Sequence, residues 1–254
     1  MILLKERVRI LRRSFSFHTH GVITMSRIFI TGDTHCDYDW RKINTKNFPE
    51  QKKLSKDDFV IIAGDFGGVW AQDNTDKYII KTYEKRNFTT CFVDGNHENH
   101  DAIDRYPVEE WHGGKIHRIS DTVIHFMRGQ VYEIDGRTIF TMGGAESSDK
   151  EYRVEGESWW SREVPSDEEY DEAIRNLKAH DFKVNYIVTH CAPEDYLYCT
   201  EMDVTRRPNR QTAFFSNIIT EHGIEFDGWY FGHYHRDIDF EKFHCVYQRI
   251  IEVE

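Results

Sequence analysis

The sequence lacks any run of about 18 apolar residues, the length that a membrane-spanning helix needs, so we expect no membrane association. It also lacks an excess of basic charge, because 33 Lys and Arg stand against 44 Asp and Glu, a formal net charge of −11. Affinity for duplex nucleic acid rests largely on Lys and Arg that neutralise phosphates. We therefore expect no duplex nucleic acid as a partner, although a local basic pocket remains compatible with this charge.

Cysteine is scarce and unpatterned. The five cysteines are an odd number without Cys-x-x-Cys spacing, which argues against a disulfide framework and favours a reduced, cytoplasmic protein. No Pro/Gly/Ser-rich linker or repeat divides the chain, so we expect one domain over residues 25–254. Residues 1–24 are basic and have only a short apolar run, too short for a secretory signal. They are expected to be a flexible or mis-started extension, without metal ligands.

What the chain does hold is a series of apolar runs that stop abruptly and then present polar side chains. Residues 28–31 lead through Gly32 into Asp33 and His35, and residues 59–63 lead into Asp65. A third run, residues 90–93, leads into Asn96 and His97. The spacings from Asp33 to Asp65 and on to Asn96 are 32 and 31 residues, as successive right-handed βαβ units give. Open α/β sheets place their ligand sites at such strand ends.

The rest of the chain continues the pattern with other elements. Helices are predicted over residues 75–88, 166–179 and 209–222 from amphipathic spacing, the second with a capping box at Ser166. Two further apolar runs end in Thr189-His190 and in Gly232-His233-Tyr234-His235. The remaining strands are predicted over residues 123–127, 130–134, 138–142 and 184–188, with residues 243–251 closing a second sheet.

These strand ends supply carboxylates, imidazoles and an amide oxygen, a mixture that suits a hard or borderline divalent cation. So many ligands are sufficient for two ions. A pair of ions about 3.5–4 Å apart would polarise a substrate oxygen and lower the pKa of a shared water toward about 7. The candidate residues are Asp33, His35, Asp65, Asn96, His97, His190, His233 and His235.

Five blocks at these positions resemble, in order, the signature blocks of the calcineurin-like metallophosphoesterase superfamily. They read Gly-Asp33-Thr-His35, Gly-Asp65-Phe-Gly, Gly-Asn96-His97-Glu, Thr-His190-Cys-Ala-Pro and Gly-His233-Tyr-His235. The resemblance implies an α/β fold, a four-layer sandwich of two mixed β-sheets flanked by helices, with a dinuclear metal site at the strand ends. It places Asp33, His35 and His235 on one metal ion, Asn96, His190 and His233 on the other, and Asp65 between them.

By the same resemblance the chain is expected to be a phosphoesterase that hydrolyses phosphomonoesters or phosphodiesters. A metal-bridging hydroxide would be the nucleophile and His97 the general acid. The expected cofactors are two divalent ions, Mn²⁺ first, with Fe, Zn, Ni, Co or Mg as alternatives, and the substrate is a small molecule or a phosphopeptide. A nuclease or cyclic-nucleotide phosphodiesterase of the same superfamily and a non-catalytic metal-binding scaffold remain as alternatives.

The insert over residues 143–165 resembles a bacterial and phage subgroup described as serine/threonine phosphatase-like. The second block departs from the eukaryotic-type protein phosphatases, which continue it as Gly-Asp-x-x-Asp-Arg-Gly, because here Asp65 is followed by Phe-Gly-Gly. A phosphate-binding Arg must then come from elsewhere, with Arg153 the first candidate before Arg162 and Arg206. Trp159 and Trp160 are expected to wall the substrate cleft. Because the usual orienting Asp is absent, Asp94 or Glu98 is expected to fix the tautomer of His97.

Overall fold

The computed structural model describes residues 25–200 and 209–254. The predicted N-terminal extension and Arg206 lie outside these described residues. Over the described ranges no helix is both long and apolar enough to cross a membrane.

One seven-stranded sheet carries the first three apolar runs. β1 (Ile28–Thr31), β2 (Phe59–Ala63) and β3 (Thr89–Val93) lie side by side and parallel, in the order in which they occur in the chain. Every residue of these strands is buried, as expected for strands covered on both faces. The full order is β13-β1-β2-β3-β6-β5-β4, with β4 (Val108–Trp111), β5 (Gly114–Ser120), β6 (Val123–Phe126) and β13 (Ile250–Val253).

The second sheet has six strands and is also mixed. β9 (Tyr186–Thr189) and β10 (Gly228–Phe231) are parallel neighbours at its centre. A tight turn at Asp135-Gly136 joins β7 (Gln130–Ile134) to β8 (Arg137–Met142) in an antiparallel hairpin. The order is β11-β12-β10-β9-β8-β7, with β11 (Ile238–Phe240) and β12 (Phe243–Cys245) at one edge.

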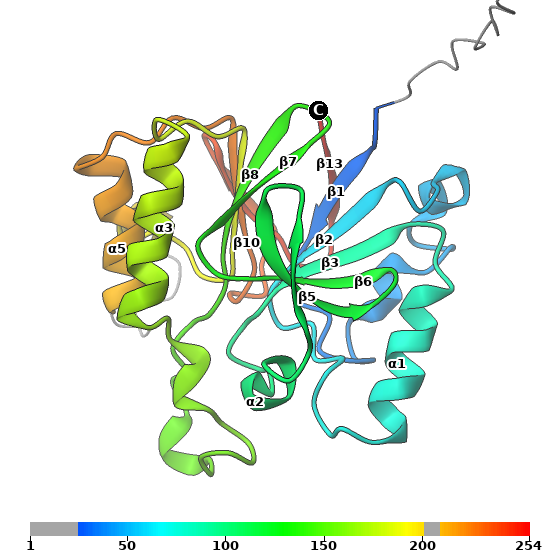
Figure 1. The fold of residues 1–254 in the computed structure, drawn as a ribbon. Helices are drawn as coiled ribbons and strands as arrows, with labels where there is room; N and C mark the ends of the chain where they lie inside the picture. The colour runs from blue at the N-terminus through cyan, green and yellow to red at the C-terminus, as the bar shows by residue number, and fades with distance from the viewer. Residues whose placement is uncertain (1–24, 201–208) are drawn as a thin grey trace, which may run out of the picture.

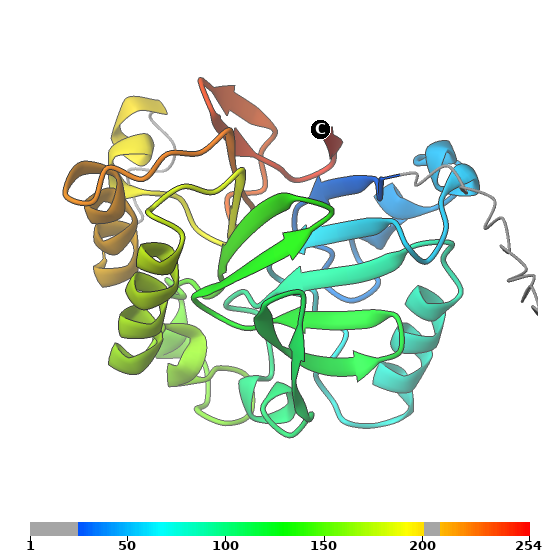
Figure 2. The same ribbon diagram turned by 45° about the horizontal axis from the view of Figure 1, so that its top comes forward.

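The two sheets and the helices on their outer faces form four layers (Figures 1 and 2). Within β2, Ile61 packs between the sheets and Ile62 packs outward in the cluster that includes Tyr83 of α1 (Asn74–Glu84). On the opposite side, α3 (Asp167–Ala179) and α5 (Arg210–Thr220) cover the second sheet. The predicted α/β four-layer sandwich is therefore confirmed. The shorter helices are α2 (His100–Ile103) and α4 (Glu194–Thr200).

The C-terminal tail was predicted to form one closing strand of the second sheet, but it forms two strands in different sheets. β12 pairs with β10 in the second sheet, but β13 pairs antiparallel with β1 in the first. Between them the Asp237 carboxylate accepts bonds from the backbone N–H groups of residues 247–249 at 2.7–3.3 Å. The Lys42 ammonium donates to the Tyr247 carbonyl at 2.5 Å. Because these side chains satisfy the backbone groups that a continuous strand would pair, the tail changes sheets here.

Candidate metal centre

The carboxyl ends of five parallel strands from both sheets meet at one place. The loop after β1 carries Asp33 and His35, and the loop after β2 carries Asp65. Asn96 and His97 follow β3, His190 follows β9, and the loop after β10 carries His233 and His235. The structure thus brings all eight predicted residues to one site, although they span 202 positions of the chain from Asp33 to His235.

The backbone at this site is held in a conformation that few side chains adopt. His35, Asp65, His233 and His235 all have positive φ, between 42° and 67°, a region that non-glycine residues rarely enter. The loops brace one another, because the N–H of His35 donates to the carbonyl of Asp65 at 2.8 Å. Strain of this kind persists only where the surroundings fix it, and it concentrates at functional sites.

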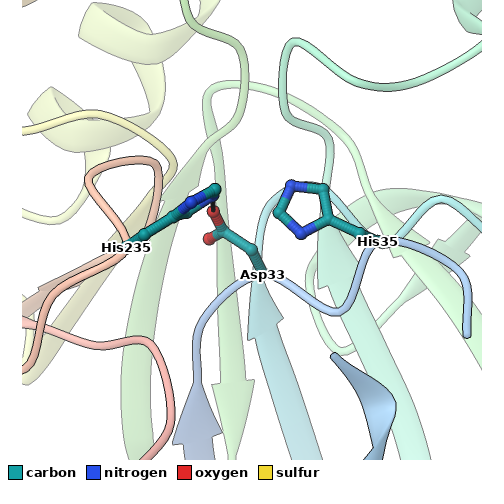
Figure 3. A group of neighbouring side chains, drawn as sticks. All are labelled: Asp33, His35 and His235. Atoms are coloured by element: carbon teal, nitrogen blue, oxygen red, sulfur yellow. Dashed lines mark ion pairs between the residues drawn. The ribbon is translucent and has the colours of Figure 1, made fainter. Parts of the chain in front are cut away.

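One group of ligand atoms gathers around Asp33. Its Oδ2 lies 3.0 Å from Nε2 of His235, and Figure 3 shows the carboxylate between the rings of His35 and His235. One potential ligand atom from each of the three residues lies within 4.8 Å of the others. The backbone N–H of His233 donates to Oδ1 of Asp33 at 3.0 Å, which fixes the orientation of the carboxylate.

A second group of ligand atoms lies beside the first, because Asp33, Asp65 and His190 also offer atoms within 4.8 Å of one another. Asp65 contacts a histidine of each group. Oδ2 of Asp65 lies 3.3 Å from Nε2 of His35, while Oδ1 lies 3.4 Å from Nε2 of His190. Oδ1 of Asn96 is 3.2 Å from the same His190 nitrogen, and the ring of His233 lies 4.9 Å from that of His190. The Asp65 carboxylate is therefore located between the two groups.

The electrostatics of this site favour bound cations. Asp33 and Asp65 are 0% and 1% exposed, and two carboxylates so deeply buried require positive partners. Burial alone would lower the pKa of His35 and His190, but the hydrogen bonds and charge of Asp65 raise each pKa to about 9. Burial would raise the pKa of Asp65, yet His190 and His35 hold that pKa well below its ordinary value. This donor set and its charge fit divalent metal ions.

Contacts behind the histidines fix which ring nitrogen faces the centre. Nδ1 of His35 pairs with Asp39 at 2.8 Å, and Nδ1 of His190 bonds the carbonyl of Ala63 at 2.8 Å. The hydroxyl of Tyr247 donates to Asp39 at 2.9 Å, and its ring stacks on His235 at 4.8 Å. The two Nδ1 contacts leave Nε2 of His35 and of His190 for a metal ion. The sequence alone identified neither Asp39 nor Tyr247 as part of the site. The position of Asp39, four residues after His35, could have indicated that it pairs with that histidine. Tyr247 comes from the distant C-terminal tail, and no sequence pattern indicates its contact.

His97 lies at the edge of the same site. Its backbone N–H donates to Oδ1 of Asp65 at 2.8 Å, and its ring lies 5.8 Å from that of His35. Burial lowers the pKa of His97, and the positive charge of Arg153 lowers this pKa further. The two predicted orienting partners are bonded elsewhere. The carboxylate of Glu98 accepts from backbone N–H groups of the loop after β2, and that of Asp94 pairs with Arg128.

The predicted substrate contacts differ in their placement. The guanidinium of Arg153 forms a two-point pair with Asp149, at 2.9 and 2.8 Å, within electrostatic reach of His97. Trp160 is only 4% exposed, and its Nε1 donates to Asp101 at 3.0 Å. Arg162 pairs with Asp104 at 3.3 Å. Of these three side chains, only Arg153 combines partial exposure with an electrostatic effect on His97.

A cavity of about 280 Å³ adjoins the centre and includes His233 in its wall. The other lining residues come from the insert, from α4 and the loop before it, from the start of α5 and from the loop after β10: Ala145, Glu146, Ser147, Ser148, Lys150, Cys191, Leu197, Asn209, Thr212 and Tyr234. A larger groove of about 520 Å³ lies beside α1, and its wall contains none of the eight candidate residues. Of these two cavities, the smaller one is therefore the one that adjoins the centre.

Comparisons with known proteins identify the family to which the chain belongs. No curated protein matches the chain with significance. A solved structure, a phosphopantetheinyl hydrolase from Mycobacterium tuberculosis, is similar at 16% sequence identity and a TM-score of 0.45, over 88% of this chain and 90% of that one. A sequence model described as calcineurin-like phosphoesterase matches residues 26–237, most of the chain. The chain therefore belongs to the calcineurin-like phosphoesterase family, whose members are phosphoester hydrolases.

Proposed function

We propose that this chain hydrolyses phosphomonoesters or phosphodiesters with two divalent ions held by its converging strand ends. Asp33, His35 and His235 would hold one ion, and Asn96, His190 and His233 the other. The observation that carries this proposal is the placement of Asp65, whose two oxygens face His35 and His190 separately. Two ions bound there would polarise the phosphate and lower the pKa of water toward about 7, which supplies a nucleophile at neutral pH.

His97 and Arg153 are proposed to act on the substrate directly. His97 would give a proton to the leaving oxygen, and the bond from its N–H to Asp65 keeps it beside the centre. Arg153 would bind phosphate oxygens through its two remaining N–H groups, because Asp149 and the Ser158 carbonyl accept the other three and hold the guanidinium in place. Trp160 is omitted from the proposed contacts because its ring is buried against Trp70.

We place the leaving group in the cavity beside His233. Its volume of about 280 Å³ suits a small molecule or a single phosphorylated side chain better than a nucleic-acid strand. We propose a cytoplasmic enzyme that uses Mn²⁺. A panel of aryl and alkyl phosphates, diesters, cyclic nucleotides and phosphopeptides, assayed with Mn²⁺, Mg²⁺, Zn²⁺ and Ni²⁺, tests the substrate class. Turnover of none of them would favour the metal-binding scaffold, and turnover of nucleic acid alone would favour the nuclease.

The shared carboxylate predicts the metal content. Protein loaded with excess Mn²⁺ and desalted should contain two equivalents per chain. Asp65→Asn should contain one equivalent or fewer, because the substitution removes the charge between the two ligand groups and keeps a side chain that tolerates positive φ. Asp37→Asn, a change at an exposed carboxylate near His35, is the matched control and should keep two. Two equivalents retained by Asp65→Asn would exclude Asp65 as the shared ligand.

The cavity predicts a substrate-dependent effect of filling it. Ser148 is exposed at the rim, so Ser148→Tyr should leave the fold intact while occupying the space beside His233. For a bulky aryl phosphate we expect kcat/KM to fall about tenfold or more, the size of effect that follows from losing a pocket contact. For methyl phosphate, whose leaving group is too small to reach the cavity, kcat/KM should stay unchanged. Equal losses on both esters would show that the leaving group binds elsewhere.

A further inference from the structure

Asn96 differs from the other proposed ligands because its side chain has two unlike ends. An amide offers a cation its oxygen and never its NH₂ group, and the two ends have nearly the same shape. Oδ1 points toward His190, and Nδ2 donates to Oγ of Ser147 at 3.2 Å. Asn96 is 8% exposed, so water has little part in choosing between the two orientations. The side chains behind Asn96 must therefore decide which end faces the ions.

Those side chains come from the insert between β8 and α3. Oγ of Ser147 donates to Oε2 of Glu163 at 2.6 Å, and the N–H of Ser147 donates to Oε1 at 2.8 Å. Ser147 is 5% exposed and Glu163 is 1% exposed. An ionised carboxylate can only accept hydrogen bonds. The hydroxyl hydrogen of Ser147 is therefore directed at Glu163, and only its lone pairs remain for Asn96.

The direction of the chain of bonds follows from these roles. A lone pair on Ser147 requires a donor, and the only donor on the Asn96 side chain is Nδ2. The hydrogen bonds must then run from Asn96 to Ser147 and from Ser147 to Glu163. We propose that Ser147 and Glu163 are positioning residues that hold the amide of Asn96 with its oxygen toward the second ion, the one proposed to bind Asn96, His190 and His233. The insert then completes that site without touching the ion. This inference rests on the proposed role of Asn96 as a ligand.

The first test removes the hydroxyl. Titration of the metal-free full-length chain with Mn²⁺ by calorimetry should resolve two binding events. Ser147→Ala should weaken the second-ion affinity about 10–100-fold, the usual effect of losing an outer hydrogen bond to a ligand, with little change at the first. Ser147→Thr keeps a hydroxyl and should restore most of the affinity. Ser161→Ala, at an exposed serine of the same insert, is the control and should bind both ions normally.

The second test reverses which groups donate and which accept along the hydrogen bonds from Asn96 to Glu163, without removing a side chain. Glu163→Gln can donate its NH₂ to Ser147, which frees the hydroxyl to donate to Oδ1 of Asn96 and turns the amide over. We expect second-ion affinity to fall as in Ser147→Ala. The titrations belong at alkaline pH, because burial raises the pKa of Glu163 and the wild-type carboxylate must be ionised. An Asn96→Asp side chain presents an oxygen in either orientation. In that background, Ser147→Ala should therefore leave the affinity for the second ion unchanged.

The outcomes separate this inference from the proposed function. If Asn96→Ala leaves second-ion binding intact, Asn96 is not a ligand and the proposed metal site is wrong. If Asn96→Ala weakens binding of the second ion but Glu163→Gln and Ser147→Ala do not, Asn96 is still supported as a ligand, and the positioning role of Ser147 and Glu163 is overturned. Circular dichroism and the Tm of each metal-free variant identify any that fail to fold. The Asn96→Asp comparison then decides, because a general loss of structure would weaken binding in both backgrounds.

Discussion

Replacing His97 with alanine should leave both ions bound and lower kcat on alkyl phosphates by about 10²–10⁴-fold, the usual contribution of a positioned general acid. His97 follows Asn96 in the loop after β3, and its N–H is fixed on Asp65 at 2.8 Å. This backbone bond keeps His97 beside the candidate metal centre, and the proposed role does not require its ring to coordinate a metal. An alkoxide leaving group is a strong base and needs the proton as its bond breaks, so removing the imidazole should slow this step most.

The leaving group itself provides the control. A nitrophenolate needs little protonation, so the loss in His97→Ala should shrink for a nitrophenyl ester relative to an alkyl ester. Stopped-flow or steady-state assays on a series of esters should show that kcat falls more steeply with the pKa of the leaving group in the variant than in the wild type. Equal losses on both ester classes would assign His97 to phosphate binding. Loss of an ion, found by metal analysis of the same preparation, would make His97 a ligand.

The sequence predicts the parts of this molecule that follow from local rules. Unbroken apolar runs such as residues 59–63 indicate strands buried on both faces, and β2 has that range. The regular spacing of Asp33, Asp65 and Asn96 requires adjacent parallel strands, and β1, β2 and β3 are adjacent and parallel. Because such strands end at one sheet edge, the meeting of their polar residues follows from the same pattern.

The parts that sequence reasoning misses depend on contacts across long separations. Residues 243–251 look like one strand, and only the bonds from Asp237 and Lys42 to the backbone near Tyr247 show why the tail divides between the sheets. Tyr247 of this tail stacks on His235, a contact that no residue spacing in the sequence predicts. Ser147 and Glu163 are ordinary residues of an irregular insert. Their roles emerge only when the donor and acceptor of each bond are assigned in space.

The polar cluster behind the loop after β3 predicts the largest change in stability. Arg128 is fully enclosed, and its guanidinium donates to Oδ2 of Asp94 at 2.9 and 2.5 Å, to Glu169 at 3.2 Å and to the carbonyl of Arg162 at 2.7 Å. It thereby ties the end of β3 to α3 and to the insert. Arg128→Met should lower the free energy of unfolding by about 3–5 kcal/mol, because it removes the guanidinium from the buried Asp94 carboxylate and leaves it only the imidazoles of His125, at 3.2 Å, and His100, at 3.8 Å.

Urea unfolding followed by circular dichroism measures this loss, and two comparisons identify its origin. Lys183→Met breaks an ion pair with Glu225 whose members are 61% and 68% exposed, so it should cost about 0–1 kcal/mol. Asp94→Asn removes the stranded charge, so the double variant with Arg128→Met should recover part of the loss, and the coupling energy of the cycle measures the pair. Should Arg128→Met cost no more than Lys183→Met, the buried pair would not be what joins the insert to the end of β3.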